Sequence, residues 1–384
     1  YALGPVYTGT GGTINSMTVP DLLKNPNIEP SFGRSLEVGL DTRFLKNRVG
    51  MSFTFYRQQN KNQILNLGVS GASGFDQTIV NAGLIQNQGV ELTLTGRPLQ
   101  SKMFSWDATF NFARNRNKII ELYPGIGGIE LDFNTYSSQR VSIRSDLNRA
   151  FGTLLGPGYR RDAATGKILL GADNMPLFDA LKDFGSVLPQ YTGGFLNNFR
   201  IGKFQIGAMI DFQKGGQFFS WTKMLAVKSG QAAETAALND KGGNVRDPLT
   251  SNGGYKINGI YGPGTIIGGN NVGGQEVTAY VDARTYFRNN IGTRIYDEWL
   301  YDASYIKLRE VSVGYTFDEA MLGRSPFKSI KVAFIARNPV MIWQKAPKGL
   351  DPSELSAGSS SISWIEKGEL QTVRSFGLNL NFTF

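Results

Sequence analysis

The sequence of 384 residues contains no cysteine and no histidine. These two absences exclude a disulfide framework, zinc fingers, iron–sulfur or haem ligation by these side chains, and catalysis through a thiol or an imidazole. A chain that avoids cysteine also suits passage through an oxidising periplasm, where a stray thiol can be trapped in a disulfide. We therefore expect no cofactor and no metal site.

Charged residues and long apolar runs are scarce as well. Charged side chains make up 18 % of the sequence, against about 25 % in ordinary soluble domains. No run of apolar residues is long enough for a transmembrane helix, which needs about 18. The net charge is +9, but the basic residues are scattered and not gathered into the blocks that bind nucleic acid. We expect no nucleic-acid partner.

Glycine and aromatic residues are abundant, which favours an all-β chain with many turns. Apolar and polar residues alternate with a period of two in nine segments, as in half-buried strands. The phase of this alternation changes near Arg309 and Glu310, as a β-bulge would cause. The expected strands lie within residues 36–41, 49–56, 90–95, 104–112, 191–201, 204–212, 305–317, 330–337 and 376–384.

The connections between these segments alternate between short and long. Strands joined in this way form an up-and-down antiparallel meander with tight turns at one rim and large loops at the other, which is typical of a transmembrane β-barrel of the outer membrane. A soluble sandwich shares the alternation, but loops much longer than about 15 residues are unusual in a compact soluble domain. The expected long extracellular loops are 62–84, 115–189, 214–304 and 339–370.

Nine strands do not complete a bacterial barrel, since such barrels have even strand numbers. We therefore expect residues 31–384 to be the C-terminal portion of a larger barrel, and residues 1–30 to be an extracellular loop that enters it. Short amphipathic stretches at 177–184 and 231–239 predict helices within the loops.

Several short stretches resemble one known family, in their order and spacing along the chain. Asn25–Pro30 followed by Leu36–Asp41 resembles the family's strand entry, and Phe53–Arg57 resembles the next strand. On these stretches the whole chain resembles the C-terminal barrel section of a SusC/RagA-type TonB-dependent transporter of Bacteroidota. Further matching stretches are Asn81–Gly83, Asn87–Leu92, Asp302–Arg309, Val313–Phe317, Ala336–Asn338 and Leu350–Pro352.

This resemblance implies a barrel of about 22 strands, integral to the bacterial outer membrane and blocked by a plug. It implies an importer of oligosaccharides or peptides that is not an enzyme. The implied partners are a SusD-like surface lipoprotein, TonB through a plug region, and the lipopolysaccharide and lipid of the outer membrane. The alternative is a structural subunit of a larger outer-membrane complex for protein export or insertion.

Acidic residues recur on the polar face of the predicted strands. In a complete transporter such residues hold a plug by hydrogen bonds and ion pairs, while the alternatives are guidance of cargo and, least of all, paired acid/base chemistry. The candidates for this lumen-facing or plug-facing role are Glu37, Asp41, Glu91, Asp107 and Asp211.

Aromatic and basic residues of the long loops are candidates for ligand or partner contacts, because specificity usually lies in loops. The alternative for them is packing between the loops themselves. At the C-terminus, Phe384 is a candidate barrel-assembly signal, or an anchor of the aromatic belt. The loop candidates are Tyr159, Arg160, Arg161, Phe218, Trp221, Trp299, Tyr301 and Trp364.

Overall fold

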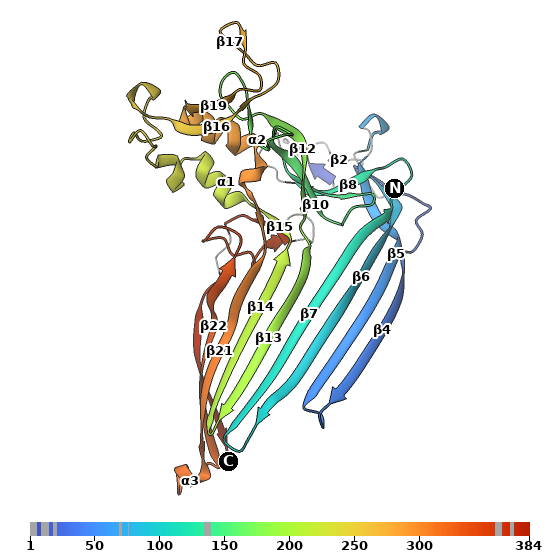
Figure 1. The fold of residues 1–384 in the computed structure, drawn as a ribbon. Helices are drawn as coiled ribbons and strands as arrows, with labels where there is room; N and C mark the ends of the chain where they lie inside the picture. Colours follow the sequence, from blue (N-terminus) through green and yellow to red (C-terminus); the bar gives the residue numbers. More distant parts are fainter. Residues whose placement is uncertain are drawn as a thin grey trace.

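The computed structural model describes residues 6–8, 15–17, 21–68, 71–75, 77–133, 140–357, 363–368 and 372–384. These residues form an all-β architecture with few short helices, and no helix among them is long and apolar enough to cross a membrane. One large sheet carries the structure, and the long connections gather at one end of it (Figure 1).

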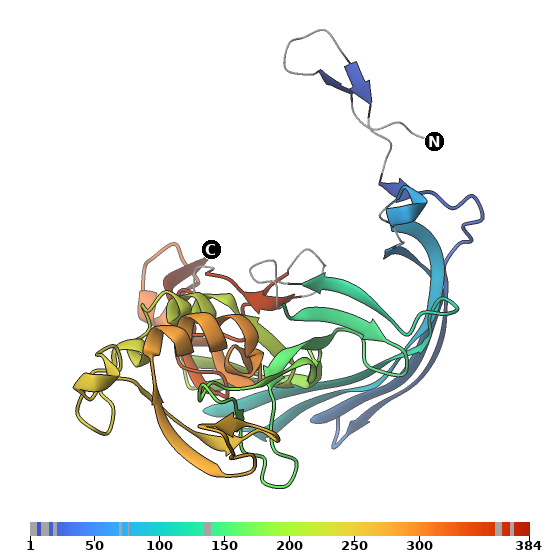
Figure 2. The ribbon, with the colours of Figure 1, turned by 90° about the horizontal axis from the view of Figure 1, so that it is seen from above.

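In the large sheet, each strand pairs antiparallel with the next one along its path, and β3 (Leu22–Leu23) pairs parallel with β6 beside that path. The sheet curves across its width, and β4 and β25 form its two edges (Figure 2). Every segment in which the sequence predicts a strand lies in this path. Its strands are β4 (Phe32–Phe44), β5 (Val49–Gly68), β6 (Gln77–Gln100), β7 (Phe104–Glu121), β13 (Pro189–Ile201), β14 (Phe204–Gly215), β21 (Tyr305–Asp318), β22 (Ser329–Gln344) and β25 (Ser375–Thr383).

Several strands are longer than the alternation predicts. β5 and β6 continue in register from Lys61 paired with Leu84 to Gly68 paired with Gln77, so the predicted loop 62–84 is reduced to a connection at 69–76. β7 continues to Glu121 and β22 to Gln344. In β5 the added part begins with Gln58–Asn62, which is polar on both faces and therefore shows no alternation. In β22 the added part is mostly apolar, from Val340 to Trp343, and likewise shows no period of two.

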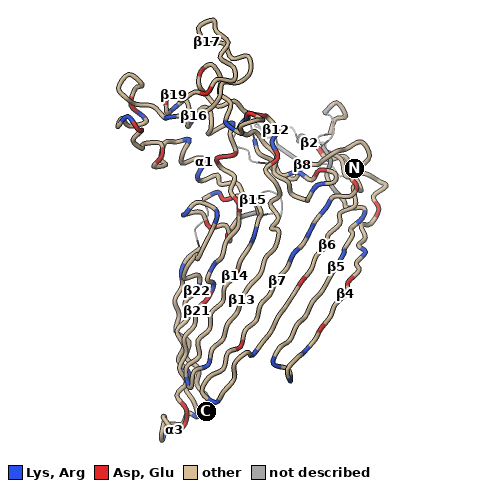
Figure 3. Tube along the Cα trace, in the orientation of Figure 1, with Lys and Arg blue, Asp and Glu red and all other residues tan. Residues whose placement is uncertain are grey.

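The two faces of the sheet differ in chemistry. The apolar set of each strand lies on one face and is widely exposed, as for Leu36 at 60 % and Phe376 at 65 %. Aromatic rings on this face contact each other across strands, with Phe110 and Phe212 stacked at 6.1 Å between ring centroids. Charged residues are frequent in the loops and also lie along β4, β5 and β6, while the middle of β13 and β14 is uncharged (Figure 3).

The predicted bulge is present in β21. Its register shifts between Leu308 and Glu310, and Arg309 is the extra residue opposite β14. At the same place β22 has one residue more than β21, because Val340 pairs with Leu308 and Arg337 with Glu310. The extra residue restores the polar face to the same side along the whole strand.

Three long connections, loops 122–188, 216–304 and 345–374, fold together above one rim of the sheet (Figure 1). Small sheets are shared between them: β11 of the first loop pairs with β16 of the second, and β15 of the second pairs with β24 of the third. We call this body the loop assembly. Its strands are β8 (Gly128–Phe133), β9 (Ser142–Asp146), β10 (Thr153–Tyr159), β11 (Leu169–Leu170), β12 (Phe178–Ser186), β15 (Gln217–Ser220), β16 (Tyr255–Tyr261), β17 (Ile266–Ile267), β18 (Asn270–Asn271), β19 (Glu276–Val281), β20 (Leu300–Asp302), β23 (Ser356–Ala357) and β24 (Ser363–Glu366).

Short helices complete the loop assembly and the turns. The longest is α1 (Trp221–Lys228), which begins at Ser220, whose hydroxyl accepts a hydrogen bond from the Lys223 backbone N–H. The others are η1 (Gly71–Ser73), η2 (Ala233–Ala236), η3 (Leu249–Ser251), the π-helix η4 (Thr285–Ile291), α2 (Gly292–Arg294), η5 (Tyr296–Glu298) and α3 (Glu319–Leu322).

Two predictions for segments outside the large sheet need correction. Residues 177–184 have apolar residues at helical spacing, but the segment is strand β12, because its backbone pairs with β10. Residues 231–239 contain only the single turn η2. Within residues 1–30, strands β1 (Val6–Thr8) and β2 (Asn15–Met17) pair with one another, and residues 1–5, 9–14 and 18–20 lie outside the described residues.

The third loop is bonded to both of the others through β24. The Trp364 indole N–H donates to Asp132 of the first loop, at 3.0 Å, and both groups are buried. Glu366 accepts hydrogen bonds from Ser220 at 2.5 Å and from Thr222 at 2.6 Å, both in the second loop. The side chain of Trp364 is fully buried in the apolar core that all three loops share.

We predict that Trp364→Ala destabilises the loop assembly by about 3–5 kcal/mol, because it leaves a large cavity in that core and removes the donor to Asp132. Hydrogen exchange of the loop amides in the purified receptor measures the change. Trp343→Ala is the matched control, since Trp343 is 47 % exposed on the apolar face of β22. Equal protection of the loops in both variants would contradict the role given to Trp364.

Candidate functional site

The register of the large sheet places the five predicted acidic residues on one face. Asp41 pairs with Ser52, and the same row continues through the neighbouring strands to Asp211 and Lys307. Side chains alternate along a strand, so residues two or four positions from this row share its face. Glu37, Glu91 and Asp107 are such residues, on β4, β6 and β7. We call this the polar face.

At the loop end of the polar face, Lys307 of β21 holds the third loop against the sheet. Its side chain is only 3 % exposed, and its ammonium lies 2.7 Å from Asp351 Oδ2 and 2.9 Å from Ser353 Oγ. Thr372 Oγ1 donates to the same carboxylate oxygen at 2.9 Å. Both ends of loop 345–374 are therefore bonded to one charge pair, whose lysine is buried and whose carboxylate is half-buried.

The Asp351 carboxyl is held in its charged form. Burial alone would raise its pKa, but the hydrogen bonds from Lys307 and Ser353 outweigh that effect, so the pKa lies below its ordinary value. A carboxyl whose pKa is lowered on folding stabilises the folded state above its unfolded pKa, and this contribution is lost as pH falls through the folded pKa. The contact therefore weakens only in acid.

A second cation on the same strand extends this contact. Arg309, the bulge residue, donates from Nε to Asp211 Oδ2 at 2.8 Å and from Nη1 to Glu354 at 3.2 Å. The Tyr305 hydroxyl donates to the same oxygen of Asp211 at 3.1 Å. Predicted Asp211 is thus brought together with the third loop, and the bulge turns Arg309 toward both carboxylates. We call residues 211, 305, 307, 309, 351, 353, 354 and 372 the loop anchor.

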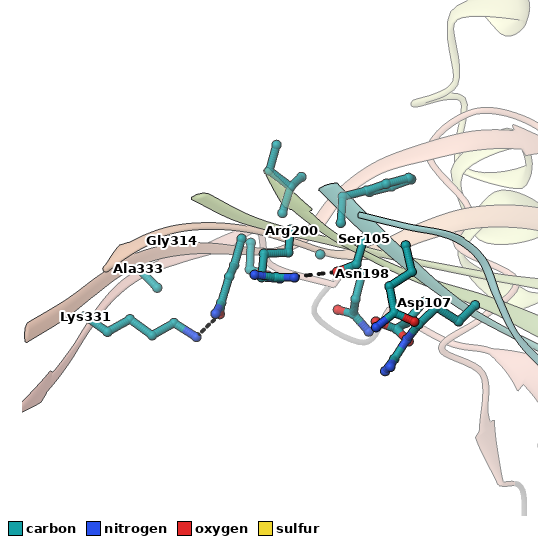
Figure 4. Close-up of a pocket in the computed structure, with 14 residues that line it drawn as sticks. Ser105, Asp107, Asn198, Arg200, Gly314, Lys331 and Ala333 are labelled. Carbon is teal, nitrogen blue, oxygen red and sulfur yellow. Dashed lines mark hydrogen bonds and ion pairs between the residues drawn. The ribbon is translucent and has the colours of Figure 1, made fainter. Parts of the chain in front are cut away.

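The other predicted acidic residues lie away from the loop anchor. Asp107 pairs with Arg97 at 2.6 Å in a pocket of about 440 Å³ on the polar face, near the short turns. Arg200 donates to Ser105 at 3.4 Å in the same pocket, and Lys331 bonds to Gln205 (Figure 4). Glu37 accepts a hydrogen bond from Ser35 at 3.2 Å. The five residues share a face but do not form one cluster, since Asp211 belongs to the loop anchor and Asp107 to the pocket near the short turns.

The predicted loop aromatics are mostly core residues. Tyr159, Trp299 and Trp364 are buried in the shared core, and Trp221 packs against it half-buried. Phe218 is fully buried beside Tyr301, with ring centroids 5.9 Å apart, in a smaller core. These rings pack between the loops, and their role in ligand or partner contact stays a prediction.

Tyr159 forms hydrogen bonds that join the first loop to the second within the shared core. Its hydroxyl donates to Glu298 at 2.6 Å, and its backbone N–H donates to Asp297 at 2.8 Å. Burial, with the nearby Tyr286 and Glu298, raises the pKa of Tyr159 far above its ordinary value, so the donating proton is kept. The first loop is in this way bonded to the second.

The two predicted arginines remain at the surface. Arg160 forms an ion pair with Asp179 at 2.7 Å, and Arg161 donates to the Gly166 carbonyl at 3.0 Å. At the other end of the molecule, Phe384 is 73 % exposed and contacts Phe327, with ring centroids 5.0 Å apart. The roles of these residues in ligand contact and in barrel assembly stay predictions.

Sequence reasoning missed Lys307, Asp351 and Glu366. Lys307 lies on the polar face of a predicted strand, and Asp351 lies in a stretch that resembles the family, so both positions were visible. The ion pair between Lys307 and Asp351 was not visible, because it joins residues 44 positions apart in the sequence.

We predict that Lys307→Met releases the third loop, because it leaves the half-buried carboxylate of Asp351 without its cation, at a cost of up to about 3–5 kcal/mol. The amides of residues 346–355 should then exchange faster in the purified receptor. Lys331→Met is the matched control, a lysine on the same face whose contact to Gln205 is exposed. Unchanged exchange in the Lys307 variant would show that the third loop is held by other contacts.

Comparison with known proteins gives consistent results. A family model described as "TonB dependent receptor-like, beta-barrel" matches residues 2–318. TonB-dependent receptor P3 of Formosa agariphila is 24 % identical over 99 % of the chain and 37 % of its own length. TonB-dependent receptor SusC of Bacteroides thetaiotaomicron is 26 % identical over 34 % of the chain and 13 % of its own length. The chain thus spans well under half of these relatives.

Solved structures agree on the fold. The RagAB peptide transporter superposes with a TM-score of 0.69 at 16 % identity, covering 99 % of this chain and 38 % of that chain. The "open-open" state of the RagAB peptide importer gives a TM-score of 0.64 at 17 % identity, covering 100 % and 38 % of the two chains. The chain therefore belongs to the TonB-dependent receptor β-barrel family, as part of a receptor of the SusC/RagA type.

Proposed function

We propose that this chain is the C-terminal portion of the barrel of an outer-membrane importer of oligosaccharides or peptides, driven by TonB. The observation that carries the proposal is the division of the large sheet into a widely exposed apolar face and a polar face bonded to a loop. An exposed apolar face is stable against lipid and not against water. The polar face then surrounds the path of the cargo.

A barrel of about 22 strands would be completed by further strands at the two edges, β4 and β25, which each have one partner among the described residues. A plug within such a barrel would meet the polar face. The pocket around Asp107, Arg97 and Arg200 offers both charge signs to a polar plug surface. TonB would act on the plug from the periplasmic side.

The loop assembly would form the outer side of the cargo chamber, facing a SusD-like lipoprotein. Support comes from its shared core, which makes it a firm surface for a partner to close upon. RagAB is titled a peptide transporter, which supports peptides as one cargo class. No group in the loop anchor needs to act as a catalyst, because the chemistry of import is binding and release.

We predict that the loop assembly faces the outside of the cell and the short turns face the periplasm. The chain has no cysteine, so an introduced cysteine is the one labelling site in it. Ile266→Cys, at the exposed tip of β17, should react with a membrane-impermeant maleimide on intact cells, whereas Met321→Cys, in α3 at the other rim, should react only after lysis. The reverse pattern would invert the proposed orientation.

We predict that deletion of the receptor abolishes uptake of one cargo class by whole cells, and that a protonophore does the same in wild-type cells. Labelled peptides and oligosaccharides, tested separately, give the measurement, and the full-length gene supplied in trans should restore uptake. Unchanged uptake of every cargo would contradict the proposal. Stoichiometric co-purification with a secretion or assembly complex, in place of a SusD-like lipoprotein, would instead favour the structural-subunit function.

A further inference from the structure

The loop assembly contains a cleft of about 990 Å³ between α1 and η4, apart from the loop anchor. Its apolar floor includes Leu225, Val227 and Phe287. Ligand pockets are of this kind, with a volume of roughly 300–1,000 Å³ and a few polar groups over an apolar floor. The charged residues that line it are Lys228, Arg246, Arg284, Arg288, Lys367 and the single carboxylate Asp282.

Positive charge dominates the lining of the cleft, and its single carboxylate, Asp282, already accepts hydrogen bonds from within the chain. Asp282 accepts hydrogen bonds from the Thr285 backbone N–H at 2.7 Å and from the Thr285 hydroxyl at 2.8 Å. Arg284 and Arg288 are exposed in the cleft wall and form no ion pair with the described residues. Burial lowers the pKa of Lys228, and the nearby charge of Arg288 lowers it further.

The arginine-bearing element is held rigidly. η4 is a π-helix, a rare conformation that is often found at functional sites. Phe287 lies between Arg284 and Arg288 along the chain and is buried, with its ring 4.9 Å from that of Tyr255 and 5.1 Å from that of Tyr286. The side chain of Arg246, across the cleft, is fixed by donating to Thr235 and to the Gly230 carbonyl. The backbone of η4 and the side chain of Arg246 are therefore held in place before any ligand arrives.

We propose that this cleft binds an oligomer that carries several carboxylates, so that the imported cargo is acidic. The inference rests on the proposed import function and names its cargo chemistry. A guanidinium binds a carboxylate through two parallel hydrogen bonds, and Arg284 and Arg288 present two such groups in the wall of the cleft. A recessed cleft of this volume fits a chain of a few residues or sugar units.

The test measures binding to the full-length receptor, purified in detergent, by isothermal titration calorimetry. The probes are hexaglutamate and tetragalacturonate, each compared with its neutral counterpart, hexaglutamine and a neutral galactose tetramer. We expect at least one acidic oligomer to bind about 10-fold or more tightly than its neutral counterpart, a difference of about 1.4 kcal/mol. The probe that binds identifies the source of the carboxylates.

Arg288→Glu should weaken binding of that probe by about 10-fold or more. Arg324→Glu is the matched control, with the same charge change at an exposed position beside α3, and should leave binding unchanged. A thermal unfolding transition like that of the wild type shows that each variant is folded; if Arg288→Glu lacks one, Arg284→Gln takes its place. Equal affinity for acidic and neutral oligomers, or equal weakening by both charge reversals, would overturn the inference. If cells take up a neutral cargo only when the receptor is present, the acidic-cargo inference fails while the proposed import function is supported.

Discussion

The bonding of β24 to both neighbouring loops is the interaction on which the rest of this structure depends. Trp364 fills the shared core and donates to Asp132 of the first loop, while Glu366 accepts from Ser220 and Thr222 of the second. Loops of this length lose much conformational entropy when they become ordered, and this loss opposes folding. The apolar core that the three loops share and the hydrogen bonds between them offset that cost for all three loops together.

The loop anchor extends this order into the sheet. Lys307 and Arg309 stand on the polar face of β21 and reach Asp351 and Glu354, so the third loop is bonded to the sheet as well as to the other loops. A displacement of β21 would thus reach the loop assembly through short ionic contacts. The cleft lined by basic residues between α1 and η4 belongs to the same loop assembly. If it binds cargo as we propose, the bound cargo lies on a body that is bonded to the sheet through the loop anchor.

The sequence was sufficient to locate the strands of the large sheet, the bulge at Arg309 and the face shared by Glu37 through Asp211, because each follows from an alternation with a period of two. It was insufficient where that alternation stops. β5 runs on through Gln58–Asn62 with polar residues on both sides. In the loops, an aromatic residue looks the same whether it meets a ligand or a neighbouring loop, so the burial of Phe218 and Trp299 depends on contacts distant in sequence. Residues 177–184 show a helical spacing that pairing with β10 overrides.

Native-state hydrogen exchange on the intact receptor tests the central claim most directly. If the three loops form one cooperative body, amides in β10, α1 and β24 should open with the same free energy, to within about 1 kcal/mol, and with the same dependence on denaturant. Opening of α1 at a free energy several kcal/mol below that of β10, with a separate denaturant dependence, would contradict the account and would show that the loops are independent of one another.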